Sequence, residues 1–311
     1  MDIAIRVEGL SKRYGGIPAL KDVSFKVGRG QIFGYLGPNG AGKTTTIKIL
    51  LDLINRDGGV VEVLGFDPMF DRREVLSRVG YTPELPSLPK FLNGIEFLIL
   101  SARMSGLSYS EAKSRARYLL DLVGLSSDAK KKIGKYSKGM MQKLSIANAL
   151  ISSPELLILD EPTLGMDPIG RAEVRDIILE VNKMGVTVFL SSHLLGEVER
   201  ICNHVALIRK GEIIFTGELN EMIKLAGGEI ILVVTLDKPI PGLEDKLLKL
   251  DYVTRVTSDG NKYRIVTSGD EHRAEISKLI SEAGGLILEM KTERLDLETA
   301  FIKLIGRGRR R

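Results

Sequence analysis

One glycine-rich stretch, Gly37-Pro38-Asn39-Gly40-Ala41-Gly42-Lys43-Thr44, decides the fold of this chain. Its spacing is that of a phosphate-binding loop, in which glycines let successive backbone N–H groups surround an anion and the following helix adds its positive end. In this pattern the lysine contacts the β- and γ-phosphates of a nucleotide, and the next hydroxyl ligates Mg²⁺. We therefore expect Gly37 to Thr45 to bind nucleotide phosphates, with Lys43 as the mobile charge and Thr44 as a metal ligand.

The segments around this loop have the pattern of an α/β domain. Gln31 to Leu36 predicts a strand that leads into the loop, and Thr44 to Leu53 predicts the helix that follows. Strand-like and helix-like segments then alternate over the first ~220 residues, which predicts a mostly parallel sheet with helices around it. Further strands are expected at Ile3 to Val7, Val23 to Val27, Val60 to Leu64, Val79 to Thr82, Leu156 to Leu159, Val186 to Leu190 and Val205 to Arg209, and further helices within Asn93 to Val123 and at Met140 to Ile151.

The composition is that of an ordinary globular protein. Hydrophobic residues make up 43% and charged residues 27% of the 311 positions, which excludes the collagen-like, disordered and disulfide-scaffold classes. The single cysteine, Cys202, forbids an internal disulfide and fits a reducing compartment. No stretch approaches the ~18–20 apolar residues of a membrane-spanning helix, and the first residues lack the pattern of a signal peptide. The net charge of +5 does not indicate nucleic-acid binding.

Two acidic residues follow the most apolar strand candidate. Leu156 to Leu159 is typical of a strand buried on both faces, and Asp160 and Glu161 come directly after it. Ligands of open α/β sheets lie at the carboxyl ends of the strands, so Asp160 is expected where a phosphate-bound Mg²⁺ would be. Glu161 is suited to polarise an attacking water. Two surface acids at a strand end are the alternative interpretation, and the phosphate loop argues against it.

The last third of the chain has a different order of elements. Glu229 to Leu236 predicts a strand and Leu243 to Leu250 a helix, and two further strands flank the turn signal Asp259-Gly260. A helix at Glu271 to Ala283 and a strand at Leu286 to Lys291 follow. This is the β-α-β-β-α-β order of a ferredoxin-like unit. A closing helix is expected from Asp296 to Ile305, and the boundary between the two parts is expected within Leu219 to Gly228.

A helix start upstream of Asp160 makes the chain recognisable. Its sequence, Tyr136-Ser137-Lys138-Gly139-Met140-Met141-Gln142-Lys143, resembles the signature motif of ABC-type ATPases, whose usual form is Leu-Ser-Gly-Gly-Gln. In that family the serine hydroxyl and glycine amides hold the γ-phosphate bound to the opposite subunit, so the resemblance assigns Ser137 and Gly139 to ATP binding. The segment departs from the family at Tyr136, Lys138 and Met140, and taken alone it is also typical of an ordinary capped helix.

Other elements of the same family follow in the expected order. The segment Glu161 to Pro168 resembles the loop by which two subunits touch, with methionine at position 166 where leucine is usual. His193 resembles the switch histidine that senses the γ-phosphate, and Tyr14 resembles the aromatic residue that stacks on adenine. Either residue could instead be merely structural. Glu84, in Gly80-Tyr81-Thr82-Pro83-Glu84, falls where the family commonly has a glutamine that touches Mg²⁺ and links to the membrane partner; a carboxylate can also ligate the metal.

The resemblance implies a fold, cofactors and an assembly. The fold is a P-loop NTPase of ABC type, with a mostly parallel core sheet, an antiparallel N-terminal β part and a helical insert at about residues 91–150, within an ATPase domain at residues 1–220. Residues 221–311 then form a small α+β ferredoxin-like unit with a basic tail, Arg307 to Arg311. ATP and Mg²⁺ would be bound between two copies arranged head to tail, or between this chain and a similar ATPase subunit. The implied catalytic residues are Lys43, Glu161 and His193, and the implied metal ligands are Thr44, Glu84 and Asp160.

The chain resembles most the ATPase subunits of exporters for drugs, lipids or polysaccharides. The Thr-Pro-Glu variant and the segment Leu297 to Phe301 carry this finer resemblance. It implies that this chain lies at the cytoplasmic face of the cell membrane, where it contacts a separate transmembrane permease through Phe91 to about Leu125, and that it has no nucleic-acid partner. Two alternatives stay open: a soluble ABC-type ATPase that acts as a mechanical switch on a ribosome or nucleic acid, and a nucleotide-binding module without turnover. The second unit could regulate, dimerise or bind a small ligand.

Overall fold

The computed structural model describes residues 2–219, 221–222, 230–267 and 272–294. The chain divides into two compact units, Met1–Leu219 and Asn220–Arg311, and each is described here by itself. Within the described residues, no helix is both long enough and apolar enough to cross a bilayer. The expected closing helix at residues 296–305, the segment 297–301 and the basic tail at 307–311 lie outside the described residues.

The centre of the first unit is a six-stranded, mostly parallel sheet. Its strands have the order β5-β6-β7-β3-β8-β9, and only β9 runs antiparallel to its neighbour. All five residues of β3 and of β6 are buried, as expected for apolar strands covered on both faces. The bounds are β3 Ile32–Leu36, β5 Val79–Thr82, β6 Leu156–Asp160, β7 Thr187–Ser192, β8 His204–Arg209 and β9 Glu212–Glu218.

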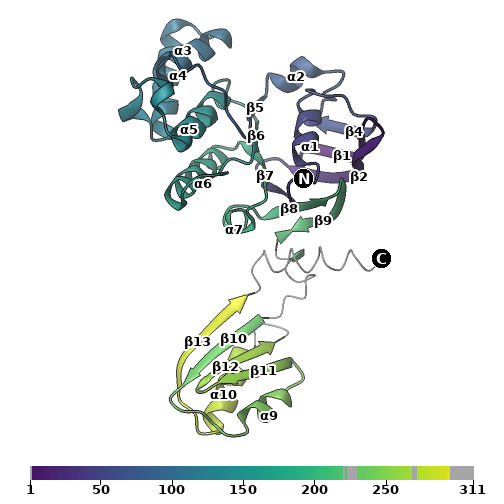
Figure 1. Cartoon of the computed structure of the whole chain (residues 1–311), viewed down its shortest axis with the longest axis vertical. Coiled ribbons are helices and arrows are strands. Elements are labelled where there is room, and N and C mark those ends of the chain that lie inside the picture. Colours follow the sequence, from purple (N-terminus) through teal and green to yellow (C-terminus); the bar gives the residue numbers. More distant parts are fainter. Residues whose placement is uncertain (1, 220, 223–229, 268–271, 295–311) are drawn as a thin grey trace. The chain divides into compact units, whose positions relative to one another are not determined.

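A second, antiparallel sheet confirms the expected N-terminal β part. It has the order β2-β1-β4, with β1 at Ile3–Tyr14, β2 at Ile17–Gly28 and β4 at Gly58–Val63. Helix α1, Lys43–Leu50, contacts β2 and β4 of this sheet and β6 of the parallel sheet, so both layers share one apolar core around it (Figure 1). The helix ends three residues before the expected Leu53, because Asp52 takes a left-handed backbone conformation with φ 50°.

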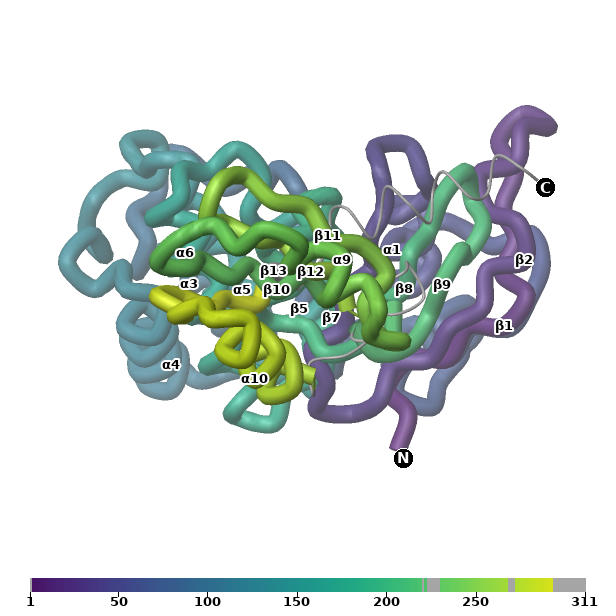
Figure 2. The backbone as a smooth tube through the Cα atoms, turned by 90° about the horizontal axis from the view of Figure 1, so that it is seen from below, coloured from purple at the N-terminus to yellow at the C-terminus, as the bar shows by residue number. Residues whose placement is uncertain are grey.

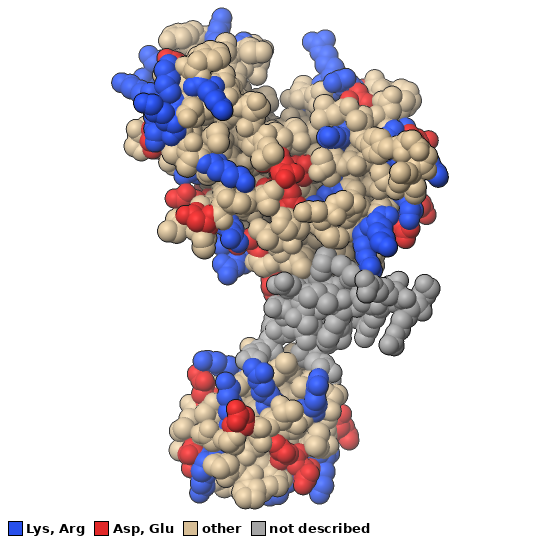
Figure 3. Space-filling view, in the orientation of Figure 1, with Lys and Arg blue, Asp and Glu red and all other residues tan. Residues whose placement is uncertain are grey.

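A helical segment projects from the other side of the parallel sheet, as expected from the sequence. It contains α3 Gly94–Met104, α4 Tyr109–Leu122, the short 3-10 turns η1 Ser126–Asp128 and η2 Ile133–Lys135, and α5 Lys138–Ala149. In Figures 1 and 2 these helices lie on one side of β5 and β7, and β1 and β2 lie on the other. Lys and Arg side chains gather over this segment on the face shown in Figure 3. Its exposed lysines include Lys130, Lys131, Lys132 and Lys135.

Local capping explains where these helices begin. Asn93 and Glu96 form a capping box at the start of α3, and Ser108 and Glu111 form another at the start of α4. The break between the two helices falls at Ser105 and the following glycine, as the sequence predicts. The other helices given for this unit are α2 Arg72–Leu76, α6 Pro168–Lys183 and α7 Leu195–Val198.

The second unit confirms the ferredoxin-like prediction. Its elements follow in the order β10 Ile230–Leu236, α9 Leu243–Leu248, β11 Val253–Asp259, β12 Lys262–Thr267, α10 Arg273–Glu282 and β13 Ile287–Arg294. The four strands form one antiparallel sheet with the order β11-β12-β10-β13. The tight turn between β11 and β12 uses Gly260 at φ 62°, a conformation that favours glycine. One face of the sheet packs on α9 and α10 through a small apolar core.

Candidate nucleotide site

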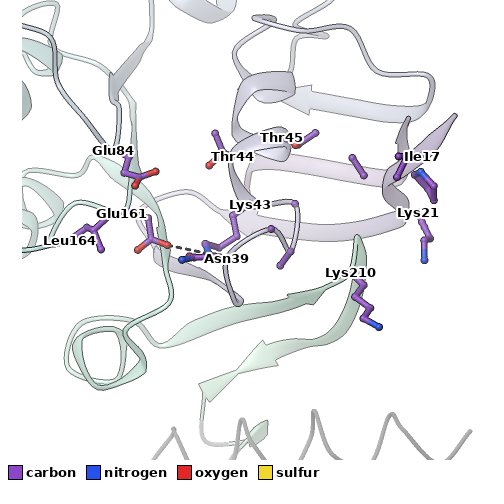
Figure 4. A pocket seen from close by; sticks show the side chains of 15 residues that line it. Ile17, Lys21, Asn39, Lys43, Thr44, Thr45, Glu84, Glu161, Leu164 and Lys210 are labelled. Carbon is purple, nitrogen blue, oxygen red and sulfur yellow. Dashed lines mark ion pairs between the residues drawn. The ribbon is translucent and has the colours of Figure 1, made fainter. Parts of the chain in front are cut away.

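A cleft of about 490 Å³ opens over the start of α1. The phosphate-loop residues from Asn39 to Thr45 form one wall, and Glu84 and Glu161 face them from the ends of β5 and β6 (Figure 4). Gly37 and Pro38 are not among the lining residues, but their carbonyl oxygens accept hydrogen bonds from Lys43 Nζ at 2.7 and 3.3 Å. The structure therefore brings most of the sequence-predicted phosphate and metal residues to one opening.

The loop adopts a shape that requires glycine. Gly40 and Gly42 have φ values of 75° and 114°, and Gly42 is the residue before the first turn of α1. A Cβ at Gly42 would lie 2.6 Å from the Leu20 side chain, whereas a Cβ at Gly40 would meet open space. The loop is therefore held against β2 at Gly42 and left open toward the cleft at Gly40. The first backbone N–H groups of a helix have no acceptor within the helix, so an anion at this opening can accept their hydrogen bonds.

Lys43 is buried and already engaged. Its side chain is only 6% exposed, and its ammonium group lies 3.1 Å from Glu161 Oε1, in addition to its hydrogen bonds with the loop carbonyls. Figure 4 shows the Lys43 and Glu161 side chains pointing toward each other across the floor of the cleft. A phosphate that enters the cleft would compete with Glu161 for this cation.

The two acids at the end of β6 point in different directions. Asp160 is 1% exposed and accepts a hydrogen bond from Ser191 Oγ at 2.6 Å. At Glu161 the backbone turns out of the strand into the left-handed region, with φ 48°. Strained backbone of this kind is concentrated at functional sites. The turn carries the Glu161 carboxylate toward His193, whose Nδ1 lies 2.8 Å from Oε2.

The oxygen donors at the cleft fit a magnesium ion. Thr44 and Glu84 line the opening, and Asp160 ends the adjacent strand. Burial, and next the charges of Asp160 and Glu84, raise the pKa of Tyr81, a residue of β5, to about 12. Within the described residues no group of three or more His, Cys, Asp or Glu side chains could enclose a metal. Mg²⁺ does not need such a cage, because it commonly binds one or two carboxylates together with substrate phosphates.

Tyr14 is not among the residues that line the cleft. It is the last residue of β1, is 48% exposed, and has the ammonium of Lys12 at 5.6 Å from its ring centroid. The neighbouring lining comes instead from residues that the sequence patterns do not single out. Leu164, in the segment that resembles the subunit-contact loop, also lines the cleft. The residues that no sequence pattern singles out are Ile17, Pro18, Ala19 and Lys21 of β2 and Lys210 between β8 and β9. No local motif marks them, because they reach the cleft through the pairing of distant strands.

Ser137 and Gly139 lie at a second cavity, of about 340 Å³. Ser137 Oγ accepts a hydrogen bond from the Met140 N–H at 3.2 Å and so caps α5. Its hydroxyl hydrogen remains able to donate. The same cavity is lined by Gly165 and Asp167, from the loop between β6 and α6. The signature-like segment and the segment that resembles the subunit-contact loop thus line one cavity. Neither Ser137 nor Gly139 lines the cleft at Lys43.

A phosphate loop between a buried strand and a helix, with a carboxylate pair at the end of another parallel strand of the same sheet, defines a P-loop nucleotide hydrolase. A family model described as ABC transporter matches residues 20–164. The linearmycin resistance ATP-binding protein of Bacillus subtilis is 34% identical over 97% of this chain and 98% of its own. The bacitracin transport ATP-binding protein of Bacillus licheniformis is 36% identical over 99% of both chains. A solved ATP-binding subunit of an ABC transporter, 32% identical, matches 72% of this chain and 93% of its own with a TM-score of 0.65. The chain belongs to the ATP-binding proteins of ABC transporters.

Proposed function

We propose that this chain binds and hydrolyses ATP with Mg²⁺ and thereby powers a separate membrane permease that exports its solute. The observation that carries the proposal is the ion pair in the phosphate-loop cleft, where Lys43 Nζ lies 3.1 Å from Glu161 Oε1. The full-length similarity to a bacitracin transport protein and to a linearmycin resistance protein supports the transport role. It favours that role over a mechanical switch on a ribosome or nucleic acid.

The residues of the cleft divide the work of phosphoryl transfer to water. Loop amides would hold the phosphate chain, and Lys43 would leave the Gly37 carbonyl and Glu161 to contact the β- and γ-phosphates. Thr44, Asp160 and Glu84 would hold Mg²⁺, which supplies charge neutralisation between the phosphates when bound. Released from Lys43, Glu161 would orient the attacking water and accept its proton.

His193 would link the γ-phosphate to Glu161. Its Nδ1 already lies 2.8 Å from Glu161 Oε2, so the ring is oriented by the carboxylate. Its backbone N–H also donates toward the same oxygen at 3.4 Å. An imidazole held in this way leaves Nε2 for another partner. We assign this second nitrogen to a phosphate oxygen.

The separate cavity at Ser137 and Gly139 supports a site shared between two copies. A two-fold, head-to-tail dimer would bring this cavity of one copy over the phosphate loop of the other. The Ser137 hydroxyl and the amides at the start of α5 would then contact the γ-phosphate, and closure on ATP would be a ligand-driven population shift. The loop that holds Asp167 lines the same cavity and would lie at the contact between copies.

The helical segment is the proposed contact with the permease. It exposes large apolar side chains, with Phe91 at 75% and Met104 at 80% exposure, as expected of a surface that another protein covers. Glu84 precedes this segment and also lines the cleft. It is therefore the residue through which ATP-driven closure would reach the permease, at the cytoplasmic face of the membrane.

Phosphate release from ATP by the purified chain tests the proposal. Hydrolysis should require Mg²⁺, and Lys43→Ala should abolish turnover and weaken ATP binding because the loop loses its mobile charge. Lys48→Ala is the matched control, since Lys48 is an exposed lysine on the same helix. It should hydrolyse ATP at the parent rate. A parent chain that releases no phosphate, or a Lys43→Ala chain as active as the parent, would contradict the proposal.

A further inference from the structure

One buried hydroxyl connects the two acids of the cleft. Ser191 lies at the carboxyl end of β7, directly opposite Asp160 in the parallel ladder, and has no exposed surface. Its Oγ lies 2.6 Å from Asp160 Oδ1 and 3.0 Å from the backbone nitrogen of Glu161. A serine hydroxyl has one hydrogen to donate and lone pairs to accept. Because the Glu161 N–H is a donor, the hydroxyl accepts from Glu161 and donates to the Asp160 carboxylate.

This contact has a reason beyond the pairing of two strands. At Glu161 the backbone takes φ 48° and leaves the strand direction, so its N–H needs an acceptor outside the regular ladder. A buried N–H without a partner loses its hydrogen bond to water and gains none in return, so this turn needs an acceptor within the protein. The Ser191 hydroxyl supplies the acceptor and thereby stabilises the turn that carries the Glu161 carboxylate to Lys43 and His193.

The same hydroxyl fixes the orientation of Asp160. It donates a hydrogen bond to Asp160 Oδ1, and because the Ser191 side chain is itself fully buried, this hydrogen bond restricts the orientation of the carboxylate plane. Groups that hydrogen-bond a metal-binding side chain from behind determine its direction and commonly change metal affinity when removed. The second oxygen of Asp160 is left for the cation.

We propose that Ser191 is a positioning residue that holds the magnesium-side carboxylate of Asp160 and the backbone of Glu161 in register through one hydroxyl. This inference rests on the proposed ATPase function and assigns to that site a residue that touches neither nucleotide nor metal. Loss of the hydroxyl should lower the affinity of the site for Mg²⁺ and also slow ATP hydrolysis, while the phosphate loop keeps its own contacts.

The test compares the parent with three variants of β7. Ser191→Ala removes the hydroxyl, and Ser191→Thr restores it. Thr187→Val is the matched control, because the Thr187 hydroxyl is also buried and accepts a backbone N–H, that of Gly30 at 2.9 Å, at the other end of the same strand. Each chain is titrated with a non-hydrolysable ATP analogue, in EDTA and at increasing Mg²⁺, and its ATP hydrolysis is measured separately.

In EDTA, the affinity of Ser191→Ala for the analogue should lie within about twofold of the parent's. The Mg²⁺ concentration at which Mg²⁺ has half its full effect on analogue binding should be ~10–100-fold higher for this variant than for the parent. Its hydrolysis rate should fall ~10–100-fold, and Ser191→Thr should recover both quantities. An unchanged Mg²⁺ requirement in Ser191→Ala, or an equal change in Thr187→Val, would overturn the assignment. A parent chain that hydrolyses no ATP would instead remove the proposed function on which it rests.

Discussion

Replacing Glu161 by glutamine separates the two tasks that the structure gives to its carboxylate. The side chain is 7% exposed, and its two oxygens face Lys43 Nζ at 3.1 Å and His193 Nδ1 at 2.8 Å. Glutamine keeps the shape of the side chain but cannot take the proton of an attacking water. Loss of a general base commonly costs ~10²–10⁴-fold in rate. We expect the hydrolysis rate of Glu161→Gln to fall by this factor.

The same substitution should strengthen ATP binding. Without nucleotide, Glu161 holds the cation that a phosphate must recruit. Two unit charges at 3.1 Å attract by about 5 kcal/mol at an effective dielectric constant of ~20, before desolvation is subtracted. A neutral amide removes this competition and the repulsion between Glu161 and the γ-phosphate. A net gain of about 1–2 kcal/mol corresponds to ATP binding ~5–30-fold tighter.

Two measurements on the same preparation check these expectations. Phosphate release at saturating ATP and Mg²⁺ gives the rate, and equilibrium dialysis gives ATP affinity. Glu155→Gln is the matched control, because Glu155 directly precedes β6 at its other end and its side chain is 42% exposed. It should match the parent in both measurements. Glu161→Gln with the parent rate would refute the assigned base, and ATP affinity equal to or weaker than the parent's would refute the competition for Lys43.

Two further predictions concern the stacking of Tyr14 on adenine and the ATP site shared between two copies. Tyr14→Phe should bind ATP nearly as the parent does and Tyr14→Ala several-fold more weakly, because base–aromatic contacts contribute ~1–3 kcal/mol; equal affinities by equilibrium dialysis would make Tyr14 merely structural. Lys43→Ala and Ser137→Arg chains, each also carrying Glu161→Gln, should retain little ATP alone after gel filtration. Mixed, they should retain about one ATP per dimer, because symmetry leaves the mixed dimer one intact site; no rescue in demonstrated mixed dimers would contradict the shared site.

The sequence predicted those parts of the fold that short-range rules determine. The strand, loop and helix around Lys43 follow from apolar runs and glycine spacing, which depend on neighbouring residues alone. The β-α-β-β-α-β order of the second unit was likewise predictable from local patterns. Asp259-Gly260 marks its hairpin, and the helical patterns of α9 and α10 are separated by strand patterns. These elements were confirmed with shifts of a few residues at their ends.

Other elements needed information that no local pattern contains. The sequence suggested a strand from Ile3 to Val7, yet β1 continues to Tyr14, since it pairs with β2 on one side and β4 on the other. Helix α6, Pro168–Lys183, was not singled out, although Asp167 caps it and its apolar stripe is buried. This helix begins where the segment that resembles a subunit-contact loop ends. The resemblance of that segment to the loop does not predict the structure of the residues that follow it.

The arrangement of the acids shows why a motif predicts which residues act but not what holds them. Asp160 and Glu161 are adjacent in sequence, and an ideal strand would send their side chains to opposite faces. The structure instead turns the backbone at Glu161, and the acceptor that stabilises this turn comes from Ser191 on another strand. That contact depends on the register by which β6 and β7 place Asp160 opposite Ser191. Register is set by the pairing of residues far apart in the chain, so a serine in this position looks like any other buried serine until the sheet is assembled.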